Sequence, residues 1–305
     1  MRTEVEFRSG GYVLRGWLEQ PADHIGPPPV VVMTHGFGGV KEWLSEASAR
    51  MAGAGFAVLA YDHPHFGTSD GLPRQHIDPT AQVHGYRDAI SYLQSRADVD
   101  ASRVAVWGTS LGGAIALVVG AVDPRVRAVV AQIPMLQPWT TLRRMLPEAQ
   151  VGSLLAALAA DRSGRCAGKP AGVMPIAGDG PGSALPDPGV REHLAERAAE
   201  SATFRNEVTL AGIDALLEFA PEAFVERIAP RPLLMTVADA DTLCPTDLAL
   251  AAFAAAREPK SLQLVSGGHH SVYQDQFEPA ITRQIEFLRS HLAALNPQKD
   301  RDHVQ

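Results

Sequence analysis

The sequence feature that most constrains the fold is a serine between two glycines, placed where a strand-like run meets a helix-like run. The motif is Gly108-Thr109-Ser110-Leu111-Gly112, a G-x-S-x-G. The apolar, β-branched run that begins at Val104 is typical of a buried strand, and the alanine-containing apolar run that ends at Val119 is typical of a buried helix. A strand that turns directly into a helix crowds the backbone, so the flanking positions must lack side chains. The pattern predicts a sharp elbow that projects the Ser110 hydroxyl at a helix N-terminus.

Strand-like and helix-like runs alternate along most of the chain, after an initial hairpin around Ser9-Gly10-Gly11. Apolar runs predict further strands at 30–34, 56–61, 126–133, 231–238 and 261–265, and periodic runs predict helices at 42–52, 80–95, 246–257 and 279–295. This alternation indicates an α/β fold, with a mostly parallel central sheet and helices on both faces. Ligands of such sheets bind at the carboxyl ends of the strands, where Ser110 and the loops at His35 and Asp62 fall.

The alternation is interrupted between residues 134 and 230, a stretch that is long for a connection between core strands. We expect a core formed by 1–133 and 231–295, a mostly helical cap at 134–230 and a polar tail at 296–305. An independent domain at 134–230 is the alternative. Apolar residues of the cap are expected to line a pocket for a medium-sized, largely apolar substrate; the candidates are Trp139, Leu142, Leu146 and Phe204.

Composition and charge argue against several classes of function. The 305 residues have a formal net charge of −7 and no dense Lys/Arg cluster, so we expect no nucleic-acid partner. Cys166 and Cys244 match no metal-binding spacing and are expected to be free thiols. The N-terminus lacks the apolar segment of a signal peptide, and no apolar run is long enough to span a bilayer. We therefore expect a cytoplasmic protein without a membrane partner, and a homodimer is compatible with the sequence.

A serine hydroxyl becomes a good nucleophile when a base lies within hydrogen-bond reach and an acid orients that base. Two adjacent histidines, His269 and His270, follow the last predicted strand. Because neighbouring side chains point in different directions, one of them can face Ser110, and we favour His269. Asp239 and Asp241 compete for the role of the acid. We favour Asp241, which lies further from its strand end, and expect Asp239 to hydrogen-bond its own loop.

Two backbone N–H groups are needed to bind the oxyanion of the tetrahedral intermediate. One is expected from Leu111, directly after the nucleophile, and the other from Phe37 in the glycine-rich loop after the first parallel strand. His63 and His65 are two residues apart, but no third ligand is near them in the sequence and serine chemistry needs no metal. We therefore expect neither a metal nor a cofactor.

These features together resemble the α/β-hydrolase superfamily over nearly the whole chain. Within it, the chain is similar to the polyketide-transferase and dipeptidyl-peptidase-like branch, which is related to dienelactone hydrolases. The stretches that carry the resemblance are His35-Gly-Phe-Gly-Gly39, Phe66-Gly-Thr-Ser-Asp-Gly71, Pro73-Arg-Gln75, Val99-Asp-Ala-Ser-Arg-Val104, Trp107-Gly-Thr-Ser-Leu-Gly-Gly113, Asp241-Thr-Leu-Cys-Pro245 and Gly267-Gly-His269.

The resemblance implies an α/β-hydrolase fold with a helical cap inserted between core strands. It also implies Ser110, Asp241 and His269 as nucleophile, acid and base. One departure stands out, because Pro64 occupies a position where the family usually has Arg. We expect His63 or His65 to replace whatever that Arg anchors.

The function we expect is a serine hydrolase that cleaves an ester or thioester of a small-molecule acyl substrate through an acyl-enzyme. Three alternatives stay open at this stage. They are an acyl transferase acting on a polyketide-like or other thioester in secondary metabolism, a peptidase or amidase, and a non-catalytic binding protein on the same fold.

Overall fold

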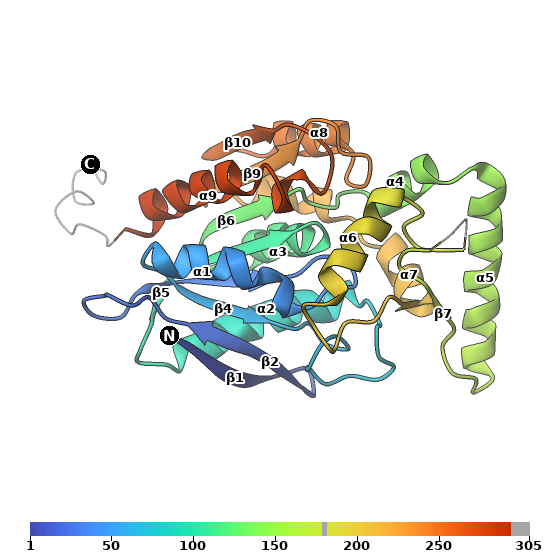
Figure 1. The fold of residues 1–305 in the computed structure, drawn as a ribbon, viewed down its shortest axis with the longest axis horizontal. Helices are drawn as coiled ribbons and strands as arrows, with labels where there is room; N and C mark the ends of the chain where they lie inside the picture. The colour runs from blue at the N-terminus through green and yellow to red at the C-terminus, as the bar shows by residue number, and fades with distance from the viewer. Residues whose placement is uncertain (179–181, 294–305) are drawn as a thin grey trace.

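An eight-stranded sheet forms the centre of the computed structural model, which describes residues 1–178 and 182–293 (Figure 1). The strand order is β1-β2-β4-β3-β5-β6-β9-β10. β1 pairs antiparallel with β2 and β2 antiparallel with β4, and all later pairs are parallel. The strands are β1 Arg2–Ser9, β2 Tyr12–Glu19, β3 Pro29–Thr34, β4 Ala57–Tyr61, β5 Asp100–Thr109, β6 Val126–Gln132, β9 Leu233–Ala238 and β10 Lys260–Val265.

Helices cover both faces of the sheet, and this confirms the predicted fold class (Figure 1). On one face lie α1 (Ser45–Gly53) and α9 (Phe277–Leu292), and on the other lie α2 (Pro79–Gln94), α3 (Leu111–Val122) and α8 (Thr246–Ala255). Because the central strands are buried on both sides, β4 and β9 are uninterrupted apolar or small-residue runs rather than alternating ones.

The segment 134–230, here called the cap segment, is mostly helical, and most of it lies beyond one end of the sheet (Figure 1). Its last part packs against α3, where Val225 and Ile228 belong to the core. The cap segment contains α4 Pro138–Met145, α5 Glu148–Cys166, α6 Pro188–Ala198, α7 Leu210–Leu217, the 3-10 helix η2 Pro221–Arg227 and a two-stranded ribbon of β7 Val173–Met174 and β8 Val208–Thr209. One apolar cluster joins cap residues such as Leu158 and Ile213 to core residues such as Phe66 and Leu111. The cap segment therefore packs on the core through a shared apolar layer.

Helix α6 begins at Pro188. The Asp187 carboxylate accepts a hydrogen bond from the Gly189 N–H at 2.8 Å, and Pro188 occupies the first helical turn. The predicted polar tail, 296–305, lies outside the described residues. Cys166 is exposed and Cys244 is buried, and they are not bonded to each other. Within the described ranges, no helix has both the length and the apolarity needed to cross a bilayer.

A buried ion pair fixes the loop that follows β3. Lys41 Nζ lies 2.8 Å from Asp62 Oδ2, and the two side chains are 4% and 0% exposed. The backbone N–H of Lys41 donates to Asp62 Oδ1 at 2.8 Å, and the Thr68 N–H donates to Oδ2 at the same distance. One carboxylate thus joins the loop after β3 to the loop after β4, so that both strand ends are held together.

Replacing Asp62 by Asn is expected to destabilise the fold, because Lys41 would stay buried without its main counter-ion. Removing one partner of a buried pair costs about 3–5 kcal/mol, and we expect the lower end because Glu42 Oε1 also lies 3.0 Å from Lys41 Nζ. Asp98→Asn, which breaks the half-exposed pair with Arg96, should cost about 1 kcal/mol or less. Equal losses in urea unfolding of the two variants would contradict the assignment.

Candidate active site

The Ser110 elbow is a sharp turn between a strand and a helix. Ser110 links β5 to α3 with φ 55° and ψ −121°, a conformation that side-chain-bearing residues rarely adopt. A Cβ on Gly108 would lie 2.0 Å from the Gly112 carbonyl oxygen, and a Cβ on Gly112 would lie 2.5 Å from the His35 carbonyl oxygen. Both glycines of the motif are therefore required by backbone packing, as the sequence predicted.

Two loops at neighbouring strand ends bring an acid and a base together near Ser110. His269, which follows β10, hydrogen-bonds through Nδ1 to Asp241 Oδ2 at 2.8 Å. The other oxygen of Asp241, which follows β9, accepts the backbone N–H groups of Leu243 at 2.9 Å and Cys244 at 2.7 Å. The carboxylate is thereby held in one orientation, and it fixes the imidazole with Nε2 available for chemistry.

The competing aspartate and histidine have other partners. Asp239 Oδ1 accepts the Gly267 N–H at 2.8 Å, so it joins the two loops without touching the base. The His270 ring is perpendicular to that of His269, at 89°, and stacks at 4.5 Å on His193 of α6. His270 therefore contacts the cap segment, whereas His269 contacts the acid.

Sequence reasoning missed the role of Cys244 in this site. Its Sγ lies 3.8 Å from Ser110 Oγ, and it is the hydrogen-bond partner of that hydroxyl among the described residues. Burial is the largest influence on the thiol and raises its pKa, so Cys244 is protonated at neutral pH. The thiol is therefore a weak, uncharged hydrogen-bond donor next to the Ser110 hydroxyl.

The neighbours of His269 control its pKa. Burial, the largest influence, disfavours the imidazolium, but Cys244 and Asp241 outweigh it and raise the pKa of His269 well above its usual value. Asp241 contributes to this rise both by its negative charge and by the hydrogen bond that it accepts from the ring. Burial lowers the pKa of His193 to about 3 and that of His270 to about 4, so both of these rings are neutral at neutral pH.

The backbone amides of Phe37 and Leu111 have the expected setting for an oxyanion hole. Leu111 is the first residue of α3, where an N–H has no acceptor within the helix. Neither amide donates a hydrogen bond to another residue in the described part of the chain. The loop that carries Phe37 approaches the elbow closely, since a Cβ on Gly36 would lie 3.1 Å from the Ser110 Cβ.

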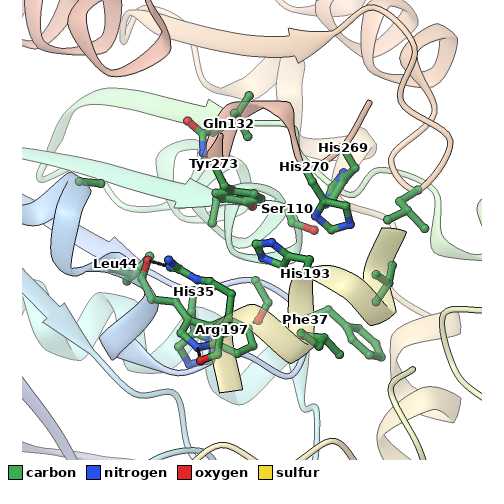
Figure 2. A pocket seen from close by; sticks show the side chains of 18 of the residues that line it. His35, Phe37, Leu44, Ser110, Gln132, His193, Arg197, His269, His270 and Tyr273 are labelled. Atoms are coloured by element: carbon green, nitrogen blue, oxygen red, sulfur yellow. Dashed lines mark hydrogen bonds between the residues drawn. The ribbon is translucent and has the colours of Figure 1, made fainter. Parts of the chain in front are cut away.

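A cavity opens in front of Ser110 between the sheet and α6, and Ser110, His193 and His270 face it (Figure 2). The lining from the cap segment comes mainly from one face of α6, with Val190, His193, Leu194 and Arg197. Trp43 and α6 are joined, because the indole Nε1 donates to the Arg197 carbonyl at 3.1 Å. In the sequence, each of these four α6 residues lies three positions from one of the others and four positions from another, which is helical spacing. That spacing is the signal from which this face of the helix could have been predicted.

The four cap residues predicted to line this cavity do not line it. Trp139 is 41% exposed on the outer side of α4, and Leu146 packs into a small cluster inside the cap segment. Phe204 lies behind Trp43, with ring centroids 4.9 Å apart. Leu142 faces a second cavity within the cap segment. Apolar character alone did not distinguish the cap segment's own packing from the wall of the catalytic cavity.

Neither the His63 nor the His65 side chain bonds to the neighbouring Asp62 carboxylate, so the expectation that one of them replaces an arginine stays a prediction. Asp62 is held by Lys41, as described above, and the His65 Nδ1 instead pairs with the Pro73 carbonyl at 2.9 Å. His63 is fully buried and donates its backbone N–H to His35 Nε2 at 3.3 Å. Among the described residues, the side chains grouped closely enough to ligate a metal are Asp241, Cys244 and His269, which the site already uses.

Known proteins with similar sequences cover the chain almost completely. A family profile described as serine aminopeptidase, S33, matches residues 26–276. Polyketide transferase ATR5 of Stachybotrys chlorohalonatus is 31% identical, over 95% of this chain and 98% of that protein. Thiohydrolase apmlB of Arthrinium phaeospermum is also 31% identical, over 95% and 97%. The crystal structure of the α/β hydrolase GrgF from Penicillium has a TM-score of 0.85 at 26% identity, over 96% of this chain and 100% of that one.

Exchanging the two aspartates for asparagine separately tests the assignment of the acid. Asp241→Asn should lower kcat about 10⁴-fold, because the imidazole would lose its orienting carboxylate. Asp239→Asn should lower it less than tenfold, since Asp239 touches the loop and not the base. Steady-state kinetics on one thioester decides between them, and the reverse order of effects would show that the acid is misassigned.

The pH dependence of kcat/KM tests the pKa of His269. The base must be neutral to accept a proton, so activity is present above its pKa and is lost as pH falls through it. Because that pKa is raised, the acid limb should lie above 6.5. For the residual activity of the Asp241→Asn variant, the acid limb of kcat/KM should move to lower pH, because the carboxylate that raises the pKa of His269 is lost. A limb near pH 4 would instead indicate His270.

Proposed function

Because this chain belongs to the serine aminopeptidase S33 family of α/β-hydrolases, we propose that it is a serine acyl hydrolase that cleaves thioesters or esters through an acyl-enzyme. The observation that carries the proposal is the hydrogen bond between His269 Nδ1 and Asp241 Oδ2, placed beside the Ser110 elbow. Base, acid and nucleophile come from three parallel-strand ends, which is the arrangement that acyl transfer to a serine requires.

In the proposed reaction, His269 Nε2 accepts the Ser110 proton while Ser110 Oγ bonds to the acyl carbon. The N–H groups of Phe37 and Leu111 bind the oxyanion, and each such donor is worth about 3 kcal/mol of barrier. The imidazolium, stabilised by Asp241, then protonates the leaving thiolate or alkoxide. A water that gives its proton to His269 attacks the acyl-serine, and Ser110 is regenerated with release of the carboxylic acid.

An acyl compound fits the cavity better than a peptide with a free amino terminus. An aminopeptidase binds the α-ammonium group of its substrate, for which buried carboxylates are the natural partners. Glu46, an exposed residue, is the one carboxylate in the lining of the catalytic cavity among the described residues. Most of the other lining side chains are aliphatic or aromatic, which suits an acyl group.

Acyl transfer to an organic acceptor is the second candidate, and α6 is the observation that favours it. The helix covers the cavity with Val190 and Leu194 and is joined to the core at Trp43. Exclusion of water from an acyl-enzyme favours another nucleophile. The relative named a polyketide transferase supports this candidate, and the relative named a thiohydrolase supports hydrolysis. Because both cysteines are unpaired, we propose that the reaction takes place in the reducing cytoplasm.

Covalent labelling and product analysis test the proposal. Wild-type protein and Ser290→Ala, a control on the outside of α9, should react with a fluorophosphonate and hydrolyse an acyl thioester. Ser110→Ala should do neither. Its midpoint of thermal unfolding should lie within about 2 °C of wild type, because the change removes one hydroxyl group. Labelled Ser110→Ala would refute the nucleophile assignment.

The same assay with an added alcohol or amine separates the two candidates. Free acid as the main product supports hydrolysis, and an acylated acceptor supports transfer. Faster cleavage of aminoacyl anilides than of thioesters would contradict both.

A further inference from the structure

A second cavity lies inside the cap segment, next to the catalytic cavity. Its walls come from the apolar faces of α4, α5 and α7, with Leu142, Leu154, Ile213 and Leu216 among them. Thr141 is its one polar side chain, and the Thr141 hydroxyl already donates to the Leu136 carbonyl at 3.4 Å. The cavity therefore offers no free polar partner from its side chains and suits hydrocarbon alone.

Three residues separate the two cavities and line both of them: Phe37, Met135 and Leu185. Phe37 belongs to the loop whose amide is proposed to bind the oxyanion. The Met135 N–H donates to the Ser110 carbonyl oxygen at 3.0 Å, so this residue is tied to the nucleophile itself. Leu185 comes from the cap segment, where its N–H donates to the Ile176 carbonyl at 2.8 Å. The partition thus begins directly beside the reacting serine.

The two cavities differ in chemistry. The catalytic cavity has several polar lining side chains, among them His193, Arg197 and Glu46, whereas Thr141 is the one polar side chain of the second cavity. When the carbonyl oxygen of an acyl substrate is bound at the amides of Phe37 and Leu111, the protein must accommodate both the leaving group and the acyl chain. The polar lining suits the leaving group, and the second cavity, across the partition, suits the hydrocarbon end.

We propose that the second cavity binds the end of an unbranched, uncharged aliphatic acyl chain, which passes between Phe37, Met135 and Leu185. This inference rests on the proposed acyl-hydrolase function and specifies its substrate class. The partition is made of flexible or freely rotating side chains, since methionine and leucine change rotamer without breaking a hydrogen bond. An unbranched chain has the smallest cross-section, so it requires the least displacement of these three side chains. A hydroxyl or charge at the chain end would be buried without a partner.

The expected signature is a chain-length series. Acyl thioesters from acetyl to dodecanoyl, with one leaving group, are compared in wild type, Ile213→Phe and Leu155→Phe. Ile213 lines the second cavity, and Leu155, 38% exposed on α5, is outside it. In wild type, kcat/KM should rise about fourfold per methylene once the chain crosses the partition. Ile213→Phe should abolish that rise and lower octanoyl turnover at least tenfold, with acetyl turnover within twofold of wild type. Leu155→Phe should match wild type.

A second variant addresses the case in which Ile213→Phe is poorly folded. Leu216→Ala enlarges the same cavity and should move the preferred chain to greater length, both in turnover and in the rate of labelling by alkyl fluorophosphonates of increasing length. An octanoyl chain with a terminal hydroxyl should react at least tenfold more slowly than octanoyl itself with wild type.

Two results would overturn the proposal. One is a chain-length profile that is flat in wild type, and the other is a profile left unchanged by both Ile213→Phe and Leu216→Ala. Failure of the function itself looks different, because wild type would then turn over none of the thioesters, acetyl included, and Ser110 would not be labelled by fluorophosphonates of any length.

Discussion

Backbone-to-backbone contact at the elbow is the constraint on which the rest of the site depends. Gly112 lies where a side chain would strike the carbonyl oxygens of Thr34 and His35, and Gly108 lies where one would strike Gly112. These contacts press α3 against the end of β3 and bring the loop with Phe37 to Ser110. Ser110, the proposed nucleophile, and the proposed oxyanion donors are thus positioned by one steric condition, before any charge is considered.

Electrostatics then distinguishes the two neighbouring histidines. Two backbone N–H groups orient Asp241, and Asp241 orients His269 and raises its pKa, while burial keeps the pKa of the adjacent His270 low. Two neighbouring histidines therefore have different chemistry, because one faces a carboxylate and the other a stacked imidazole. On the opposite side of the site, the buried pair of Lys41 and Asp62 ties the oxyanion loop to the next strand end.

The sequence predicted the features that depend on local pattern and failed where packing between distant segments decides. Glycine spacing around Ser110 predicts the elbow, and the alternation of strands and helices predicts the fold. Lys41 as the partner of Asp62 was missed, because a lysine in a helical pattern looks exposed, and the neighbours of Cys244 depend on how two loops meet. Trp139 and Leu142 were assigned to the wall of the catalytic cavity, but Trp139 is exposed and Leu142 lines the second cavity. Their apolar character alone does not say which way α4 faces.

Rapid-quench mass spectrometry tests the central claim most directly. Wild-type protein is mixed with an octanoyl thioester and quenched within the first turnover, and the intact mass and its peptides are measured. We expect a mass increase equal to one octanoyl group, located on the peptide that contains Ser110, with decay of the adduct as free acid or acylated acceptor appears. An acyl group on Cys244, or turnover without any covalent adduct, would contradict the account.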